Sequence, residues 1–403
     1  MQHDFLLIGI DGGATKVNGW SLRILEEGRA FALGEVNVTK SYREFEGYIE
    51  NFQPIDLNRQ LSEWEERKII PTELEQRQAH CYITAAVEAI FQIARQSQAE
   101  RVLVGIGMPG IKTADKRGIA VLKNGPRMID YADQIENKLR RLGIQMVTPI
   151  AEIGSDAYYC GIGEEYASEG YFRGVTNSYY LGGGTGAADA LKLAGKVIPL
   201  DETKGWFVKT WEMSDGEGHS VERYVSSRGI QAIYGDLIGK TVDELGAASI
   251  YPPQIYRLAL QGDSAAQATF AKVTFYLAKL LFERITSLYA GWQGLFEFIN
   301  PNRPAPANNH KYQRIVFDNI IIGQRLGDLL LEARGDKILW EPFTRQMTDF
   351  ICQSPVLDDT ALNYYCPGGL FNLELIKISR LREAPALGAG IDAYLNWRKV
   401  NHA

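Results

Sequence analysis

The sequence predicts an α/β protein built from two related lobes. Short apolar runs of strand length alternate with segments of helical periodicity along most of the 403 residues. A strand, a glycine turn and a second strand open the chain, and the same arrangement recurs at residues 177–191. Because the length is enough for two domains, two similar α/β halves that face each other account for the pattern.

The first part of the chain predicts a small sheet followed by an insertion and a helix. We expect strands at residues 5–10, 17–25 and 28–39, with a glycine turn joining the first two. Residues 40–76 are charged, aromatic and poor in glycine, so an insertion of loops and short helices is expected there. Good helix formers at helical spacing follow at residues 79–98.

The remainder of the chain continues this alternation of strands and helices. Residues 101–110 form a buried-type strand that ends in glycine and proline, and an amphipathic helix is expected at 130–143. We expect a strand, a short loop and a helix at 144–167, followed by a strand–glycine turn–strand at 177–191. Residues 221–296 are expected to be mainly helical. A strand, a glycine and a helix are expected at 314–333, and a helix entered through a proline at 382–398.

The composition is that of an ordinary globular protein, with 45% hydrophobic and 23% charged residues. A net charge of −6 argues against a surface that coats nucleic acid. No apolar run approaches the length needed to cross a membrane, and the N-terminus lacks a basic leader, so a cytoplasmic protein without nucleic-acid or membrane partners is expected. The four cysteines lie far apart in the sequence and are expected to be reduced and structural.

Glycine turns follow three of the apolar strands. They read IDGGATK at 10–16, LGGGTGAAD at 181–189 and IIIGQRLGD at 320–328. A single Asp-Gly-Gly is most often only a hairpin turn. Three such turns spread over two similar halves instead suit backbone N–H groups that hold the oxygens of a nucleotide triphosphate. That arrangement serves phosphoryl transfer, in which catalysis is mostly positioning and stabilisation of charge.

These motifs together resemble the sugar-kinase/actin/chaperone ATPase superfamily and, within it, the ROK family of sugar kinases and repressors. The similarity covers roughly residues 5–40, 100–235 and 314–396. The matching segments are IDGGATK and LGGGTGAAD for the two phosphate loops, GIGMPG (105–110) for the glycine-proline segment, KNGPR (123–127) for the sugar-contacting asparagine, GSDAYYCGIGEE (154–165) for the helix of the catalytic aspartate, and VERYVSSRGI (221–230) for the glutamate-to-serine segment.

The resemblance implies two ribonuclease-H-like α/β lobes with a nucleotide and sugar cleft between them. Residues 1–150 would form the N-terminal lobe, with the insertion at about 40–76, and a C-terminal helix at about 382–403 would join it. Residues 151–381 would form the C-terminal lobe. The resemblance also implies a homodimer.

Two aspartates carry the implied chemistry. Asp156 would be the general base that accepts the proton of the attacking sugar hydroxyl, although an aspartate there can also be the N-cap of a helix starting at Ala157. Asp11 would hold Mg²⁺ through water beside the phosphates, and its other interpretation is a simple turn aspartate. Catalysis is the favoured interpretation of Asp156, and the Mg²⁺ site is the favoured interpretation of Asp11.

The resemblance assigns further residues to the nucleotide. Gly323 would line the adenosine pocket, although a plain helix start also explains it, and Lys16 could equally be solvated. The residues expected to bind the nucleotide and its phosphates are Asp11, Gly12, Gly13, Thr15, Lys16, Gly183, Gly184, Thr185, Gly186 and Gly323.

The implied sugar site departs from the family pattern. Ser155 stands where asparagine is usual and reaches fewer hydroxyls, and the glutamate of the family's glutamate–glycine–histidine contact falls on either Glu212 or Glu217. Asn124 could be only a turn residue and Glu222 only an exposed helix residue. The residues expected to bind the sugar are Asn124, Ser155, Asp156, Glu212, Glu217, His219 and Glu222.

Two more departures concern a metal and the adenosine turn. Many members of the family bind a structural zinc through a cysteine cluster, but WEMSDGEGHSVERYVSS (211–227) has no cysteine, so no structural zinc is expected. The turn GQRLG at 323–327 lacks the glycine pair that is usual in the family.

The leading hypothesis is an ATP- and Mg²⁺-dependent kinase that phosphorylates a hydroxyl of a hexose-type sugar, with glucose or an N-acylhexosamine as substrate. A sugar-sensing repressor of this family would carry a helix-turn-helix ahead of the first phosphate loop, and here that loop already starts at residue 11. A nucleotide- or sugar-binding sensor that has lost catalysis is the alternative that the departures leave open.

Overall fold

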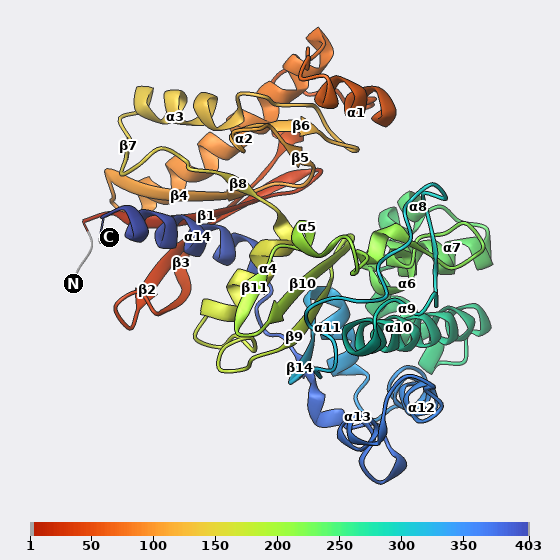
Figure 1. The fold of residues 1–403 in the computed structure, drawn as a ribbon. Coiled ribbons are helices and arrows are strands. Elements are labelled where there is room, and N and C mark those ends of the chain that lie inside the picture. The colour runs from red at the N-terminus through yellow and green to blue at the C-terminus, as the bar shows by residue number, and fades with distance from the viewer. Residues whose placement is uncertain (1–3, 402–403) are drawn as a thin grey trace. The chain divides into compact units, whose positions relative to one another are not determined.

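The computed structural model describes residues 4–401, which form two compact units (Figure 1). The first unit contains the chain up to Gly170 together with the segment from Glu383 onward, and the second unit is Tyr171–Arg382. This differs from the predicted division, which assigned residues 151–170 to the second lobe. The reason is that helix α4 (Asp156–Tyr166) packs against the C-terminal helix α14 (Ala384–Asn401) in the first unit.

The first unit is built around a mixed sheet with the strand order β3-β2-β1-β4-β7, and β8 also pairs with β4. The β1–β2–β3 meander is antiparallel, whereas β4 runs parallel to β1. The strands are β1 (Leu6–Gly12), β2 (Lys16–Leu25), β3 (Ala30–Ser41), β4 (Arg101–Gly107), β7 (Gln145–Met146) and β8 (Ile153–Gly154). Asp11 lies near the end of β1, opposite Asn18 of β2 and Gly107 of β4.

Helices cover both faces of this sheet. Ile8 and Ile10 of β1 face the core that contains α2 (Glu73–Gln96), while the alternate positions face α14, which packs beside α4 (Figure 1). The other elements of this unit are η1 (Tyr42–Glu44), α1 (Leu57–Glu65), the small sheet of β5 (Ile111–Lys112) and β6 (Ile119–Val121), and α3 (Tyr131–Arg141).

Two strand glycines allow α14 to approach the sheet closely. A Cβ atom on Gly9 of β1 would lie 1.8 Å from the carbonyl oxygen of Ala386, and one on Gly105 of β4 would lie 1.8 Å from that of Ala389. Both obstacles are backbone atoms, which cannot rotate away. The glycines inside these apolar strands are therefore explained by the close contact between helix and sheet.

The second unit repeats the topology of the first. Its sheet has the order β11-β10-β9-β14-β15, with an antiparallel β9–β10–β11 meander and β14 parallel to β9. The strands are β9 (Ser178–Gly183), β10 (Ala187–Leu193), β11 (Lys196–Ile198), β14 (Asn319–Gly323) and β15 (Ile376–Ile378). The predicted internal repeat and the α/β class are thus confirmed.

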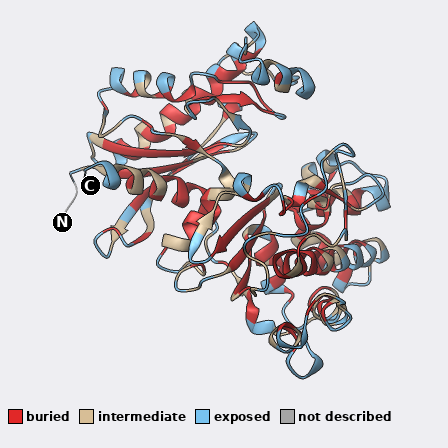
Figure 2. Ribbon diagram, viewed as in Figure 1, coloured by how far each residue is buried: buried red, intermediate tan, exposed pale blue. Residues whose placement is uncertain are grey.

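Helices make up most of the remaining second unit. The long helix α10 (Ser264–Ala290) is buried along much of its length, as the red segments of Figure 2 show. The other elements are α5 (Leu200–Thr203), η2 (Thr210–Glu212), β12 (Met213–Ser214), α6 (Glu222–Val225), α7 (Ser227–Ile238), α8 (Val242–Ala247), α9 (Pro252–Leu260), β13 (Glu297–Phe298), α11 (Gln324–Glu332), α12 (Trp340–Cys352), α13 (Asp359–Tyr365), η3 (Pro367–Gly369) and η4 (Leu373–Leu375).

One element differs from the sequence expectation in where it begins. The helix predicted at 79–98 already begins at Glu73, inside the predicted insertion, where Thr72 and Glu75 form a capping box. The four cysteines are free thiols, and the Sγ atoms of Cys352 and Cys366 lie 2.8 Å apart.

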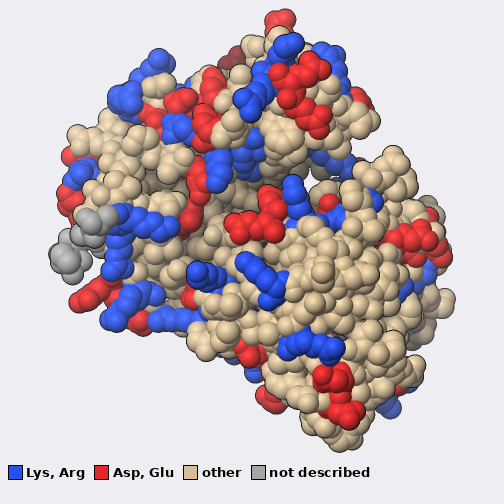
Figure 3. Space-filling view, viewed as in Figure 1, with Lys and Arg blue, Asp and Glu red and all other residues tan. Residues whose placement is uncertain are grey.

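The surface carries charged side chains of both signs. On the face drawn in Figure 3, basic and acidic side chains are intermixed. Among residues 4–401, every helix is too short or too polar to pass through a lipid bilayer.

Candidate functional site

The first glycine loop, between β1 and β2, accepts hydrogen bonds from two tyrosine hydroxyls. The hydroxyl of Tyr42 donates to the carbonyl oxygen of Gly13 at 3.0 Å, and that of Tyr82 donates to the carbonyl oxygen of Ala14 at 2.8 Å. The two buried rings stack with centroids 3.6 Å apart. Thr15 and the neighbouring Lys16 at the tip are exposed. The loop is therefore anchored by its carbonyl groups.

Asp11 lies in an acidic environment at the base of this loop. Burial, together with the negative charges of Asp156 and Glu383, raises the pKa of Asp11 to about 7, and Lys16 opposes the shift. The three carboxylates come from β1, from the start of α4 and from the residue before α14. Carboxylate oxygens are hard ligands of the kind that Mg²⁺ prefers, and a bound cation would favour the ionised form of Asp11.

Asp156 is the first residue of α4, and the N-cap position belongs to Ser155. The Ser155 hydroxyl donates to Oδ1 of Asp156 at 3.4 Å, and among the described residues it makes no side-chain capping bond. Ser155 is exposed and Asp156 is half-buried. A carboxylate at a helix N-terminus that does not cap its own helix is free to accept a proton from another molecule.

Asn124 lies in the same unit, in an exposed turn between β6 and α3. Lys123 beside it is also exposed, whereas Gly125, Pro126 and Arg127 are buried. The amide of Asn124 is thus presented to solvent by a turn whose following residues are packed into the protein.

The second glycine loop joins β9 and β10 in the second unit. Gly184 N–H donates to the carbonyl oxygen of Gly186 at 2.9 Å, and the carbonyl oxygen of Gly184 accepts from the N–H of Ser227 at 2.8 Å. Thr185 and Gly186 are exposed at the tip. Oε1 of Glu222 accepts the N–H of Ala187 at 2.7 Å, so this glutamate ties α6 to the loop.

The last residue of the LGGGTGAAD motif has a structural explanation. Oδ1 of Asp189 is 3.2 Å from Nη2 of Arg284 and accepts the hydroxyl of Thr210 at 2.6 Å. All three side chains are buried, and Arg284 also pairs with Glu283 at 2.8 Å. The network joins β10, α10 and the segment that leads to Glu212.

The third glycine turn brings a side chain against the second loop. Gly323 ends β14, and a Cβ atom there would lie 2.5 Å from the hydroxyl oxygen of Tyr180. Gln324 follows with φ of +58°, in the left-handed region that glycine favours. A Cβ atom on Gly184 would lie 2.4 Å from Oε1 of Gln324, so the amide of Gln324 lies directly beside the loop.

A cavity of about 440 Å³ opens next to this turn within the second unit. Leu326 and Leu329 of α11 give it apolar surface, and Arg325 and the Arg382–Asp328 ion pair, with Nη2 and Oδ1 3.1 Å apart, give it polar groups. The remaining lining comes from the starts of α7 and α9 and comprises Ser227, Ile230, Tyr251, Pro252, Pro253 and Gln254. Its size suits a small ligand with an apolar body.

Of the residues expected to contact sugar from 212–222, Glu212 bonds to Lys209 and Arg303, whereas Glu217 and His219 lie together beside Asp215. Oε2 of Glu212 accepts the N–H of Lys209 at 3.0 Å, and its Oε1 lies 3.6 Å from Nε of Arg303. Glu217 and His219 are exposed, and the backbone N–H groups of both donate to Asp215. Nδ1 of His219 lies 3.1 Å from Oδ2 of Asp215.

Sequence reasoning missed four groups around these loops. Three of them are far along the chain from the residues that they contact or influence, so no local pattern reveals them: Tyr42, Tyr82 and Glu383. Gln324 did have a local signal, since the turn at 323–327 lacks the usual glycine pair, but that departure did not indicate a role for its side chain.

Comparison with known proteins gives a likeness of structure. Neither a protein-family model nor any of the curated proteins matches this chain. Solved structures, by contrast, match over nearly the whole chain, among them the following three. A putative sugar kinase from Cytophaga hutchinsonii has a TM-score of 0.54 and 17% identity, over 97% of this chain and 99% of that one.

The other two are described as ROK family enzymes. A ROK family glucokinase from Streptomyces griseus, in complex with glucose and AMPPNP, has a TM-score of 0.57 and 16% identity, over 97% of this chain and 99% of that one. A ROK hexokinase from Thermus thermophilus has a TM-score of 0.54 and 15% identity, over 98% and 100%. The chain therefore has the fold of the ROK sugar kinases.

Proposed function

We propose that the protein is an ATP-dependent kinase that transfers a phosphoryl group to a hydroxyl of a hexose-type sugar, as a member of the ROK family without its cysteine zinc module. The observation that carries the proposal is the repetition of a glycine hairpin at the same place in two sheets of equal strand order. One hairpin is flanked by Asp11 and the other by Gln324, so both offer groups suited to phosphate or its metal ion.

In this mechanism Asp156, at the start of α4, accepts the proton of the attacking hydroxyl. Asn124 hydrogen-bonds a sugar hydroxyl, for which its amide offers both a donor and an acceptor. Asp11, Asp156 and Glu383 suit Mg²⁺, and Asp11 would hold it. When bound, that ion neutralises charge on the phosphates.

The cavity beside Gly323 supports the nucleotide part of the proposal. Leu326 and Leu329 suit the faces of a base, while Arg325 and Arg382 suit polar groups of a nucleotide. The cavity adjoins Gln324, whose amide lies beside the second glycine loop. A nucleoside held there would have its phosphates directed to that loop.

The test is to incubate the purified protein with Mg-ATP and a panel of glucose, mannose, N-acetylglucosamine and N-acetylmannosamine, and to follow ADP release. Asp156→Asn is expected to retain nucleotide binding and lose about 10²- to 10⁴-fold or more in turnover. Asp130→Asn, at the exposed start of α3, is the matched control and should keep full activity.

Two outcomes would overturn these assignments. Turnover that survives in Asp156→Asn would exclude this residue as the base. ATP binding without ADP release, for every sugar of the panel, would favour the alternative of a sensor that has lost catalysis.

A further inference from the structure

The inserted segment is joined to the turn that carries Asn124 by a buried glutamine. Gln60 belongs to α1, which is mostly exposed, yet its own side chain is fully buried. Oε1 of Gln60 accepts the N–H of Leu122 at 2.8 Å, and its Nε2 donates to the carbonyl oxygens of Ile55 at 2.8 Å and Leu122 at 3.3 Å. The amide thus pairs with the backbone of Leu122 in both directions.

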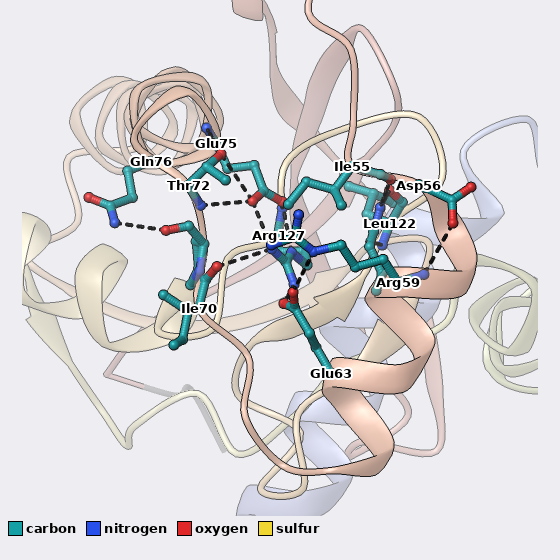
Figure 4. A network of polar contacts seen from close by, with 12 residues as sticks. Ile55, Asp56, Arg59, Glu63, Ile70, Thr72, Glu75, Gln76, Leu122 and Arg127 are labelled. Carbon is teal, nitrogen blue, oxygen red and sulfur yellow. Dashed lines mark hydrogen bonds and ion pairs between the residues drawn. The ribbon is translucent and has the colours of Figure 1, made fainter.

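A buried arginine joins the other end of the same turn to the insertion (Figure 4). Nε and Nη2 of Arg127 donate to the two carboxylate oxygens of Glu75 at 2.7 and 2.8 Å. Nη1 pairs with Glu63 of α1, and Nη2 also donates to the carbonyl oxygen of Ile70 at 3.2 Å. These side-chain partners all lie between residues 63 and 75.

These contacts bracket a short piece of chain. Leu122 and Arg127 are the two ends of the turn, and Lys123 and Asn124 at its tip are exposed. Behind the turn, a Cβ atom on Gly125 would lie 2.7 Å from Cδ2 of Leu122 and 3.1 Å from the hydroxyl oxygen of Tyr82. The turn is therefore fixed at both ends and closely packed behind.

The chemistry of the Gln60 and Arg127 contacts indicates that they position the turn more than they stabilise the fold. A buried ion pair adds little net stability compared with apolar side chains of the same volume, because removing two charges from water is costly. Directional bonds to the backbone and a bidentate arginine instead define one geometry. Leucine and methionine would have filled the same space without defining where Asn124 lies.

We propose that residues 55–75 form a clamp that fixes the 122–127 turn and thereby aims Asn124 at a sugar hydroxyl. Gln60 and Arg127 are its positioning residues, and the inserted segment sets the affinity for the sugar acceptor. This inference rests on the proposed kinase function, in which Asn124 contacts the sugar.

The test compares Gln60→Leu, which keeps the volume and removes the hydrogen bonds, with Gln76→Leu as matched control. Gln76 is exposed on α2, and its Nε2 donates to the carbonyl oxygen of Pro71 at 3.1 Å. Gln60→Leu is expected to raise the sugar KM about 3- to 10-fold, with kcat and the KM for ATP almost unchanged. Amide hydrogen exchange in a peptide spanning 119–128 should become faster. Gln76→Leu should change neither.

The exchange measurement needs no catalysis, so it separates failure of the clamp from failure of the kinase proposal. If the parent protein phosphorylates no sugar, faster exchange in Gln60→Leu still supports a clamp on the turn, and the link to the sugar is refuted. Unchanged exchange at 119–128 would overturn the clamp. Faster exchange with an unchanged sugar KM would overturn its role in aiming Asn124.

A milder variant guards against a folding defect. Glu63→Gln removes one ionic partner of Arg127 and leaves the pair with Glu75 in place. It is expected to shift the exchange and the sugar KM in the same direction as Gln60→Leu, by a smaller factor. An effect on the KM for ATP alone would contradict the proposal.

Discussion

Gln324 keeps a backbone conformation that a side chain disfavours. Its φ of +58° lies in the left-handed region, which costs a non-glycine residue about 1–2 kcal/mol. Such strain persists only where the surrounding structure enforces it, and it is frequent at binding sites. Here it directs the amide of Gln324 to the second glycine loop, at a place where the sequence pattern leads one to expect glycine.

Two substitutions of Gln324 separate the effect of backbone strain on stability from the effect of its side-chain amide on ATP binding. Gln324→Gly and Gln324→Ala both remove the amide, but only glycine relieves the strained backbone. We expect the glycine variant to be more stable than the alanine variant by about 1 kcal/mol in urea unfolding. The KM for ATP should change equally in both. Equal stability of the two variants would show that no strain is stored at this residue.

The tyrosine pair under the first loop allows a second test. Tyr82→Phe and Tyr42→Phe each remove one hydroxyl that donates to the loop, and each is expected to lower kcat/KM for ATP about tenfold. Tyr131→Phe is the control, because its buried hydroxyl finds no hydrogen-bond partner within the described part of the chain. This control should retain activity and gain slightly in stability, and a loss of activity equal to that of Tyr82→Phe would contradict the loop-anchoring role.

At the scale of elements, the contact between α14 and the sheet depends on glycine. Gly9→Ala or Gly105→Ala would place a methyl group against a backbone carbonyl of α14, so the helix or the strand must shift. We expect each to lower the free energy of unfolding by about 1–3 kcal/mol or more. Thermal unfolding followed by circular dichroism measures this.

Gly246→Ala provides the control for those variants. Gly246 lies in α8, and within residues 4–401 nothing comes within 4 Å of a Cβ atom placed there. Alanine should stabilise this helix slightly, by up to about 1 kcal/mol. If Gly9→Ala behaved like this control, the close approach of α14 would not limit stability.

The elements that could be predicted from sequence are those whose signal is local. Alternating or continuous apolar runs and glycine turns identified β1, β2, β4, β9 and β14 close to their observed bounds. The early start of α2 also had a local signal, the capping box of Thr72 and Glu75, which went unused. By contrast, the hydrogen bond between Gln60 and Leu122 joins residues far apart in the chain, and no periodic sequence pattern predicts it.

At the scale of the whole molecule, the repeated topology was visible because each half opens with the same glycine hairpin. The residues of the candidate site could be predicted only in part from the sequence. Asp11 and Asp156 stand in motifs, but Glu383, which adds a third negative charge near Asp11, comes from the far end of the chain. The cavity beside Gly323 likewise forms where α7, α9 and α11 pack near one another. The glycine turn was the only part of it with a signal in the sequence.

Buried carboxyl groups make the stability of the molecule depend on pH. Burial, together with the negative charge of Glu152, raises the pKa of Asp392 to about 6, while Lys399 and Lys116 oppose the shift. Oδ2 of Asp392 also accepts the hydroxyl of Tyr159 at 3.4 Å and the amide of Asn396 at 3.3 Å. Between the ordinary aspartate pKa and about 6, the folded protein holds a proton that the unfolded chain has lost. The free energy of unfolding therefore falls as pH rises through this range.

Asp392→Asn removes this contribution and keeps an oxygen that can accept both hydrogen bonds. The variant should be more stable than the parent by about 3 kcal/mol at pH 8, and the gain should fall below about 1 kcal/mol at pH 4, where the carboxyl of the folded parent is protonated. Taking the difference between the two proteins cancels other titrating groups, such as His310, whose pKa burial lowers. Urea unfolding at several pH values measures it. A gain that is the same at pH 4 and pH 8 would show that Asp392 is not held protonated by the fold, since only a titrating group gives a difference that grows with pH.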